Sequence, residues 1–142
     1  MTCFEGSCHC GAITVRFTTN LPDDALVPRA DQCGFCRRHH AAVVSDPAGH
    51  LDIRITAQAG LPYRFGLETT DFHVCKQCGV FVAATGLGDD PLRGVINIHA
   101  LHDRQALAQP PVAVSFDGED IAERRARRRV RWTPASVTYL VD

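Results

Sequence analysis

Hydrophobic and polar residues alternate along several short stretches of the chain, and this period of two predicts β-strands with one buried face. The alternation is clearest in residues 13–18, with the sequence ITVRFT, and in residues 51–55, with the sequence LDIRI. Five further strands are expected in residues 63–67, 80–85, 95–100, 112–116 and 137–141. The pattern therefore predicts a β-rich protein.

Helical periodicity is confined to short stretches. Helices are expected just after Cys36 and in residues 103–108 and 119–127. Turns rich in glycine, proline and aspartate separate the predicted elements, and none of them is long enough to link two domains. We therefore expect one mainly β domain that spans residues 1–142.

The composition is that of an ordinary globular protein, with 45% hydrophobic and 22% charged residues. The formal net charge is only −1, so the whole molecule has no general attraction for nucleic acid or for an anionic membrane. The charge is uneven along the chain, because six arginines lie between Arg124 and Arg131. This arginine cluster needs an explanation of its own.

Six of the seven cysteines form three closely spaced pairs. The pairs are Cys8-His9-Cys10, Cys33-Gly34-Phe35-Cys36 and Cys75-Lys76-Gln77-Cys78. Two thiolates at this spacing can bind one cation when the backbone turns sharply beside them, and Gly11, Gly34 and Gly79 allow such turns. Because these spacings are typical of zinc ligands, the sequence predicts a zinc protein.

Disulfide bonds are the competing explanation for six paired cysteines. The amino-terminal residues lack the basic and apolar segments of a signal peptide, and no apolar stretch approaches the roughly 18 residues that span a bilayer. We therefore expect a cytoplasmic protein without membrane association, in which reduced thiols serve as metal ligands. Cys3, the seventh cysteine, is expected to be a free thiol.

Three cysteine pairs can be divided into one complete zinc site and one incomplete site. Four thiolates close a tetrahedral structural site, whereas an ion with fewer protein ligands keeps a position open for water or substrate. An open position is the feature that distinguishes catalytic from structural zinc. The spacing alone leaves open which two pairs combine.

Several motifs together resemble those of a known family. The sequence GSCHCGAI of residues 6–13 resembles the opening signature of the family of glutathione-dependent formaldehyde-activating enzymes and centromere protein V. The sequences CGFCRR of residues 33–38, FHVCKQCG of residues 72–79 and FDG of residues 116–118 are similar to its later motifs and follow in the same order. The resemblance spans nearly the whole chain.

The resemblance implies both a fold and a division of the ligands. The fold would be of the Mss4-like type, built from small, strongly bent antiparallel β-sheets organised around zinc. By resemblance, the closed structural site would consist of Cys8, Cys10, Cys75 and Cys78. Metal binding there would contribute directly to the folding free energy.

The second site departs from the family pattern at Asp31. The family places a third cysteine two residues before the pair that corresponds to Cys33 and Cys36, and an aspartate occupies that position here. Because an aspartate oxygen can bind zinc, the second site is predicted to consist of Asp31 and the two thiolates, with water as the fourth ligand. Two alternatives stay open, namely His39 or His40 as the third ligand, or a site too weak to hold zinc.

The activity implied by the resemblance is the addition of the glutathione thiol to formaldehyde, which gives S-hydroxymethylglutathione and belongs to the carbon–sulfur lyases. Asp31, Cys33 and Cys36 would then hold a catalytic zinc ion. Arg37 and Arg38 would bind the carboxylates of the substrate. Glutathione or another small thiol is the expected partner.

A different class of function is a non-catalytic, zinc-stabilised binding module. Its support is the arginine cluster between Arg124 and Arg131, which would contact a nucleic acid or the acidic surface of a protein. Glu119, Asp120 and Glu123 lie just upstream and would repel phosphate. Nucleic acid is therefore the less favoured partner, and a solvated helix face is the simplest interpretation.

Overall fold

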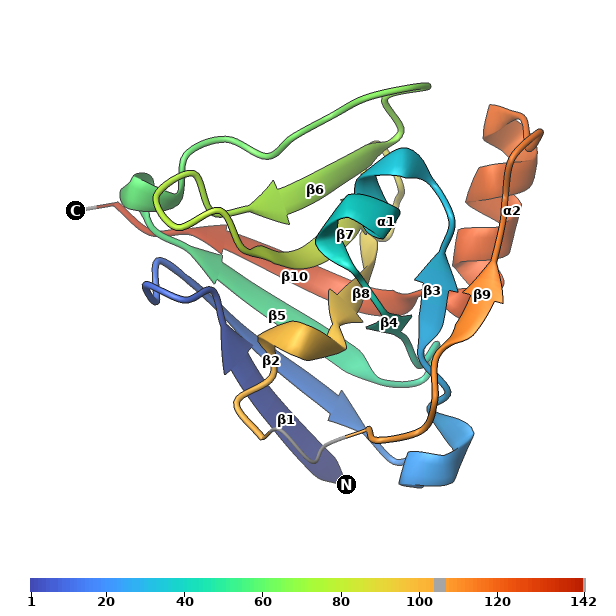
Figure 1. The fold of residues 1–142 in the computed structure, drawn as a ribbon, viewed down its shortest axis with the longest axis horizontal. Coiled ribbons are helices and arrows are strands. Elements are labelled where there is room, and N and C mark those ends of the chain that lie inside the picture. The colour runs from blue at the N-terminus through green and yellow to red at the C-terminus, as the bar shows by residue number, and fades with distance from the viewer. Residues whose placement is uncertain (104–106, 142) are drawn as a thin grey trace.

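The computed structural model describes residues 1–103 and 107–141 and is dominated by strands (Figure 1). The strands are β1 (Thr2–Ser7), β2 (Ile13–Thr19), β3 (Arg29–Asp31), β4 (Val43–Val44), β5 (His50–Ile55), β6 (Thr70–Val74), β7 (Phe81–Gly86), β8 (Arg93–Asn97), β9 (Val112–Val114) and β10 (Thr133–Tyr139). The helices are α1 (Gly34–His39) and α2 (Ile121–Arg131), with short 3₁₀ turns at Asp23–Ala25, Ala57–Ala59 and Ile98–Ala100. None of the helices in the described ranges is long and apolar enough to cross a bilayer.

The strands form one bent sheet in the order β1-β2-β5-β10-β8-β4-β3-β9, with β7 also paired to β8 and β6 paired to β7. Most neighbours are antiparallel, but β10 runs parallel to β5 and β3 runs parallel to β9. The prediction of a mainly β fold is thus confirmed, with a mixed sheet in place of a wholly antiparallel one. The strand nearest the carboxyl end, β10, lies inside the sheet between β5 and β8 (Figure 1).

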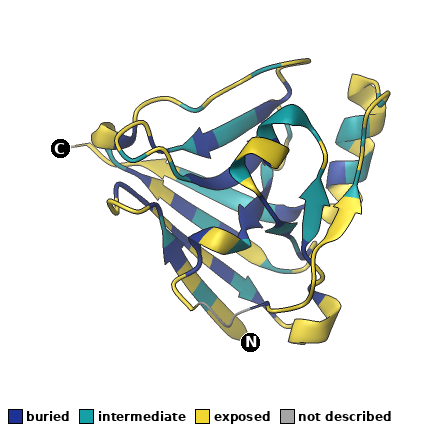
Figure 2. Cartoon of the chain, in the orientation of Figure 1, coloured by how far each residue is buried: buried dark blue, intermediate teal, exposed yellow. Residues whose placement is uncertain are grey.

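The two clearest alternating stretches form the centre of the core. Residues 13–18 belong to β2 and residues 51–55 to β5, and these strands pair in antiparallel register. Buried and more exposed residues alternate along both strands (Figure 2). Phe17, Leu51 and Ile53 are fully buried, so the period of two in the sequence marks the inner face of the sheet.

The strand predicted at residues 63–67 is wrong. Tyr63 makes only one isolated bridge with Phe72, and the chain then turns. Gly66 and Glu68 both have positive φ, at 60° and 54°, which an extended strand does not allow. Residues 63–67 therefore form a loop, and residues 65–67 of this loop line a cavity.

Other predicted boundaries shift by a few residues. The strand expected at residues 95–100 ends at Asn97, whose side-chain oxygen accepts a hydrogen bond from the backbone N–H of His99 and begins a 3₁₀ turn. The first helix begins before Cys36, at Gly34, and the helix expected at residues 119–127 is α2. Most of the helix expected at residues 103–108 lies outside the described residues.

The sequence pattern predicted only some of the remaining strands. The stretches at 80–85, 112–116 and 137–141 are confirmed as β7, β9 and β10 with shifted ends. Four strands were not predicted at all, namely β1, β3, β4 and β6.

Helix α2 is attached to the rest of the fold through an unusual buried cation, Arg128. Its guanidinium donates hydrogen bonds to the Thr69 carbonyl, at 2.6 Å, and to the hydroxyl of Thr70. The same group lies 3.8 Å from the carboxylate of Asp89 and 4.6 Å from the ring centroid of Trp132. Burial lowers the pKa of Arg128 to about 10, although Asp89 acts in the opposite direction. These contacts attach the helix to the start of β6 and to the loop between β7 and β8.

Replacing Arg128 with methionine should therefore lower the free energy of unfolding by about 2–4 kcal/mol, because buried carbonyl, hydroxyl and carboxylate groups would lose their partner. Urea denaturation followed by circular dichroism measures the change. The matched control is Arg129→Met, since Arg129 is exposed on the same helix and the change should cost less than about 0.5 kcal/mol. Equal stability of the two variants would contradict this account of α2.

Candidate functional site

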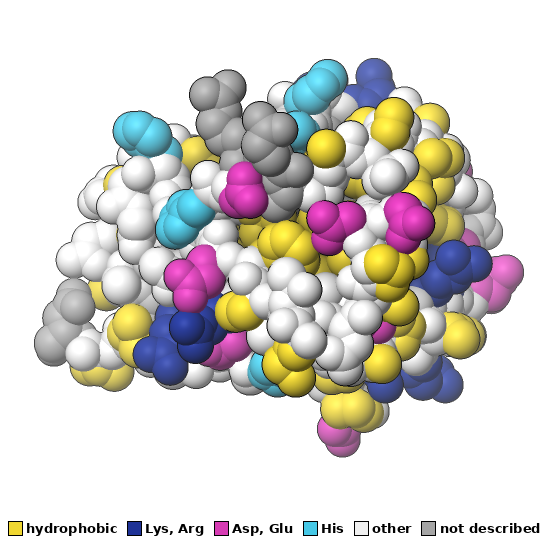
Figure 3. Space-filling model, turned by 90° about the horizontal axis from the view of Figure 1, so that it is seen from below, with side chains coloured by type: hydrophobic (Ala, Val, Ile, Leu, Met, Phe, Trp, Pro, Cys, Tyr) yellow, Lys and Arg dark blue, Asp and Glu magenta, His cyan; other side chains and the backbone are white. Residues whose placement is uncertain are grey.

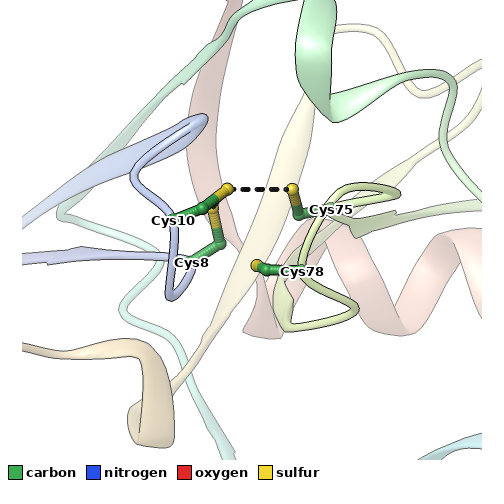
Figure 4. A group of neighbouring side chains, drawn as sticks. All are labelled: Cys8, Cys10, Cys75 and Cys78. Atoms are coloured by element: carbon green, nitrogen blue, oxygen red, sulfur yellow. Dashed lines mark hydrogen bonds between the residues drawn. The ribbon is translucent and has the colours of Figure 1, made fainter.

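Two hairpins far apart in the sequence bring four cysteines together. Cys8 and Cys10 lie in the turn between β1 and β2, and Cys75 and Cys78 lie in the turn between β6 and β7. Their side chains point toward one another (Figure 4), and all four Sγ atoms lie within 4.8 Å of each other. The structure thus brings together the four residues that the family resemblance grouped.

The spacing of the sulfur atoms suits a tetrahedral cation. The Sγ atom of Cys10 lies 3.7 Å from that of Cys8 and 3.6 Å from that of Cys75. A cation with metal–sulfur bonds of about 2.3 Å holds its sulfur ligands about 3.8 Å apart in a tetrahedron, whereas a disulfide bond requires about 2.05 Å. All seven cysteines are free thiols in the structure. The first cluster therefore has the geometry of a closed metal site.

The surroundings of the first cluster affect its thiols unequally. Burial raises the pKa of Cys75 to about 12 and also raises the pKa of Cys8. At Cys78 burial acts in the same direction, but backbone hydrogen bonds at Cys10 and Val80 outweigh it and lower the pKa to about 6. A bound cation would offset the cost of the buried negative charge and keep all four sulfur atoms deprotonated.

Two glycines give the hairpins their sharp turns. Gly11 follows the first cysteine pair with a φ of 84°, and Gly79 follows the second with a φ of 82°. Residues with a side chain rarely adopt this left-handed conformation. Gly34 does not have this role, because it occupies the first turn of α1.

The second cluster consists of Asp31, Cys33 and Cys36. One ligand atom from each residue lies within 4.8 Å of the others. Asp31 is the last residue of β3, Cys33 is the N-cap of α1, and Cys36 is buried in the first turn of that helix. The short connection from strand to helix therefore places a carboxylate and two thiols side by side.

Backbone hydrogen bonds hold the second cluster in place. The carboxylate Oδ1 of Asp31 accepts a hydrogen bond from the backbone N–H of Cys33 at 2.8 Å, and its second oxygen can still act as a ligand. The Sγ atom of Cys33 accepts one from the backbone N–H of Cys36 at 3.3 Å. Burial raises the pKa of Cys36, and the neighbouring Cys33 adds to this effect. These residues fit a cation with three protein ligands.

The structure does not bring either neighbouring histidine into this cluster. His39 stacks on Phe35 with ring centroids 4.4 Å apart, and His40 ends α1 in a left-handed conformation, 6.1 Å from the ring of His99. Within the described residues, neither histidine forms a group of ligand atoms with the two thiols. Of the alternatives left open by the sequence, the geometry favours Asp31 as third ligand.

A cavity of about 260 Å³ opens beside the second cluster, and Asp31, Cys33 and Cys36 line it. Aromatic side chains form one wall, namely Phe65, Phe72 and Phe81. The loop that replaces the strand predicted at residues 63–67 supplies the first of these. Residues of α2 and residues next to it in the sequence line another part of the cavity. A cation bound to the second cluster would therefore face this cavity, whereas the cysteines of the first cluster do not line it.

The arginines predicted to bind substrate lie elsewhere. Arg37 and Arg38 are exposed on α1 and do not line the cavity. Their side chains donate hydrogen bonds to the backbone carbonyls of Gln32, at 3.1 Å, and Gly34, at 3.0 Å. The structure thus gives these two residues a local role on the surface of the helix.

Other arginines line the cavity instead, namely Arg29, Arg124, Arg127 and Arg128. The last three belong to the arginine cluster between Arg124 and Arg131, and no sequence motif pointed to Arg29. The available signal was its position two residues before Asp31, since these side chains share one face if the segment is a strand. Burial, followed by the positive charges of Arg131 and Arg127, lowers the pKa of Arg29.

The comparisons with known proteins agree with the cysteine motifs. A family model described as "Glutathione-dependent formaldehyde-activating enzyme" matches residues 3–116. A crystal structure of a Rhodobacter sphaeroides protein is similar in fold, with 25% sequence identity and a TM-score of 0.55, over 78% of this chain and 99% of that one. A search of the curated proteins found no match.

Replacing Cys75 with alanine is expected to release the metal of the first cluster and unfold the protein, because binding by four thiolates contributes about 10–16 kcal/mol to folding. Metal analysis should give two zinc ions per wild-type chain, and circular dichroism should report the loss of structure. Cys3→Ala is the control, since Cys3 is exposed and belongs to neither cluster. A folded Cys75→Ala variant that keeps two ions would refute the assignment.

Replacing Asp31 with asparagine should weaken metal binding at the second cluster by at least about tenfold and leave the first cluster unchanged. Titration with cobalt(II), whose thiolate absorption bands report each site, gives the affinities without any assay of activity. Asp117→Asn is the matched control, because Asp117 lines the same cavity but lies outside the cluster. Unchanged cobalt affinity in the Asp31→Asn variant would exclude this carboxylate as a ligand.

Proposed function

The chain belongs to the family of glutathione-dependent formaldehyde-activating enzymes, and on this basis we propose that it adds a small thiol, such as glutathione, to an aldehyde such as formaldehyde. The reverse reaction breaks a carbon–sulfur bond, so the enzyme would be a carbon–sulfur lyase. The proposal has two zinc ions in a single domain, one structural and one catalytic. The need for reduced thiols in both clusters favours a reducing compartment such as the cytoplasm.

The observation that carries the proposal is the second cluster at the edge of the cavity. Three ligand atoms within 4.8 Å of each other leave one position of a tetrahedral ion for a substrate. The first cluster has four ligands and no such position. A structural role for the first cluster and a chemical role for the second follow from this difference.

The reaction needs one new bond and one proton transfer. The thiol sulfur attacks the aldehyde carbon to form the carbon–sulfur bond, the carbonyl π electrons move to oxygen, and the proton lost by sulfur ends on that oxygen. Zinc, when bound, supplies a Lewis acid that favours the thiolate form of the substrate at neutral pH. The protein must therefore hold the ion, orient the thiol and limit access of water.

Residues of this chain match each of these tasks. Asp31, Cys33 and Cys36 would hold the ion, because hydrogen bonds from α1 already fix the carboxylate and one thiol. The aromatic wall forms a packed layer, with the rings of Phe65 and Phe72 4.9 Å apart. Such a wall excludes water from one side of the cavity and strengthens electrostatic interactions within it.

The alternative function, a binding module that uses the arginine cluster, has less support. Arg124 and Arg127 pair with Glu119, and Arg125 and Arg128 pair with Asp89. On the face seen in Figure 3, lysines and arginines lie in separate groups among acidic and hydrophobic side chains. Most of the cluster therefore stabilises α2 and the cavity wall rather than forming a basic surface for phosphates.

Replacing Cys33 with alanine should leave the fold intact and reduce adduct formation to the spontaneous rate, because the open metal site would lose a ligand. The exchange between formaldehyde and its glutathione adduct can be followed by nuclear magnetic resonance, with and without wild-type protein. Cys3→Ala should keep the full rate excess over the spontaneous reaction. Full activity in the Cys33→Ala variant would refute the role of the second cluster.

A further inference from the structure

One part of the cavity wall comes from residues that the family model does not cover. The family match ends at residue 116, and lining residues beyond it are Asp117, Arg124, Arg127, Arg128 and Trp132. The family match therefore does not extend to these lining residues, although it includes Arg29, which lines the same cavity. The chemistry of this wall has to be derived from the residues of this chain.

Two of the arginines in this wall already have their partners. Arg127 donates two hydrogen bonds to the carboxylate of Glu119, at 2.8 and 3.0 Å, and its guanidinium lies 3.6 Å from the ring centroid of Phe116. The buried Arg128 is held by Thr69 and Thr70. Neither group is available to bind a ligand strongly.

The guanidinium groups of Arg29 and Arg124 have fewer hydrogen-bond and ion-pair partners. Among residues 1–103 and 107–141, Arg29 forms no ion pair, and its side chain donates one hydrogen bond, to the hydroxyl of Ser45 at 2.8 Å. Among the described residues, the buried Nε of Arg124 has no hydrogen-bond partner. It lies 3.5 Å from the carboxylate of Glu119, which already accepts hydrogen bonds from Arg127. Arg29 thus lines the cavity without a carboxylate partner in the described residues, and Arg124 shares the carboxylate of Glu119 with Arg127.

The fold places Arg29 on the same face as the second cluster. Arg29 and Asp31 are the first and last residues of β3, so their side chains leave one face of the strand about 7 Å apart. Pairing with β4 on one side and β9 on the other fixes this strand in the sheet. The positive charges of Arg127 and Arg131 act on Arg29, which makes an anion next to it more favourable.

We propose that Arg29, together with Arg124, binds a carboxylate of the thiol substrate and makes the cavity selective for acidic thiols over neutral ones. This inference rests on the proposed function, because it assumes that the sulfur of the same molecule approaches the second cluster. A guanidinium and a carboxylate form a charge-assisted hydrogen bond that is well suited to a half-buried position. Arg29 is then a specificity-determining residue that needs no part in the chemistry.

Trp132 gives a direct test, because it is the single tryptophan of the chain and lines the cavity. Its fluorescence would be titrated with 3-mercaptopropionate and with the neutral 3-mercaptopropionamide under reducing conditions. The wild-type protein should bind the carboxylate at least about tenfold more tightly than the amide. Arg29→Gln should remove this preference without weakening the amide, and Arg124→Gln should reduce it.

Two further variants separate charge from structure. Arg29→Lys keeps the positive charge and should retain part of the preference. Arg129→Gln removes an exposed arginine of α2 that does not line the cavity, and it should behave as wild type. Equal affinity of the wild-type protein for the two thiols, or equally tight binding of inorganic phosphate, would overturn the inference.

Failure of this inference can be distinguished from failure of the proposed function. If Cys33→Ala loses adduct formation but the wild-type protein shows no preference for the carboxylate, the inference is wrong and the function stands. If the preference is present and depends on Arg29, but Cys33→Ala keeps full activity, the carboxylate site stands and the proposed function is wrong.

Discussion

The arrangement of the molecule depends on four sulfur atoms that meet from two distant hairpins. Cys10 and Cys75 are 65 residues apart in sequence, yet their sulfur atoms are 3.6 Å apart. Burial holds the pKa of Cys75 near 12, so a negative charge on its sulfur is favourable only beside a cation. A shared ion would therefore couple the position of β6 and β7 to that of β1 and β2, and with it the position of Phe72 and Phe81 in the aromatic wall.

The second cluster offers three ligand residues where the first offers four, so a tetrahedral cation bound there would keep one position open. It lies at the junction of β3 and α1, where backbone N–H groups restrain Asp31 and Cys33 without enclosing them. A mixed carboxylate and thiolate set binds zinc as a harder site than three thiolates would. The two clusters share no ligand, so a cation that contributes to folding and a cation that faces the cavity would be held separately.

Local patterns in the sequence predicted the features that depend on neighbouring residues. Alternation identified β2 and β5 because one face of each is buried, and the cysteine spacing predicted metal ligands. The grouping of four cysteines in the first cluster and the addition of Asp31 to the second came from the family resemblance. The cavity was not predictable in the same way. Arg29 lies on a strand of three residues, which is too short for periodicity to be recognised. Only the tertiary fold brings it to the same cavity as residues of α2. The loop of residues 63–67 has strand-like composition, but positive φ values at Gly66 and Glu68 decide its course.

The central position of β10 has a consequence for biosynthesis. During translation, β5 and β8 emerge from the ribosome before the strand that joins them, so each temporarily presents an unpaired edge. The ligands of both metal clusters have been synthesised by residue 78, long before α2 and β10. If a nascent chain binds its ions early, its amino-terminal half is held together before β10 pairs with β5 and β8. Early metal binding would therefore reduce aggregation of the partly folded intermediate.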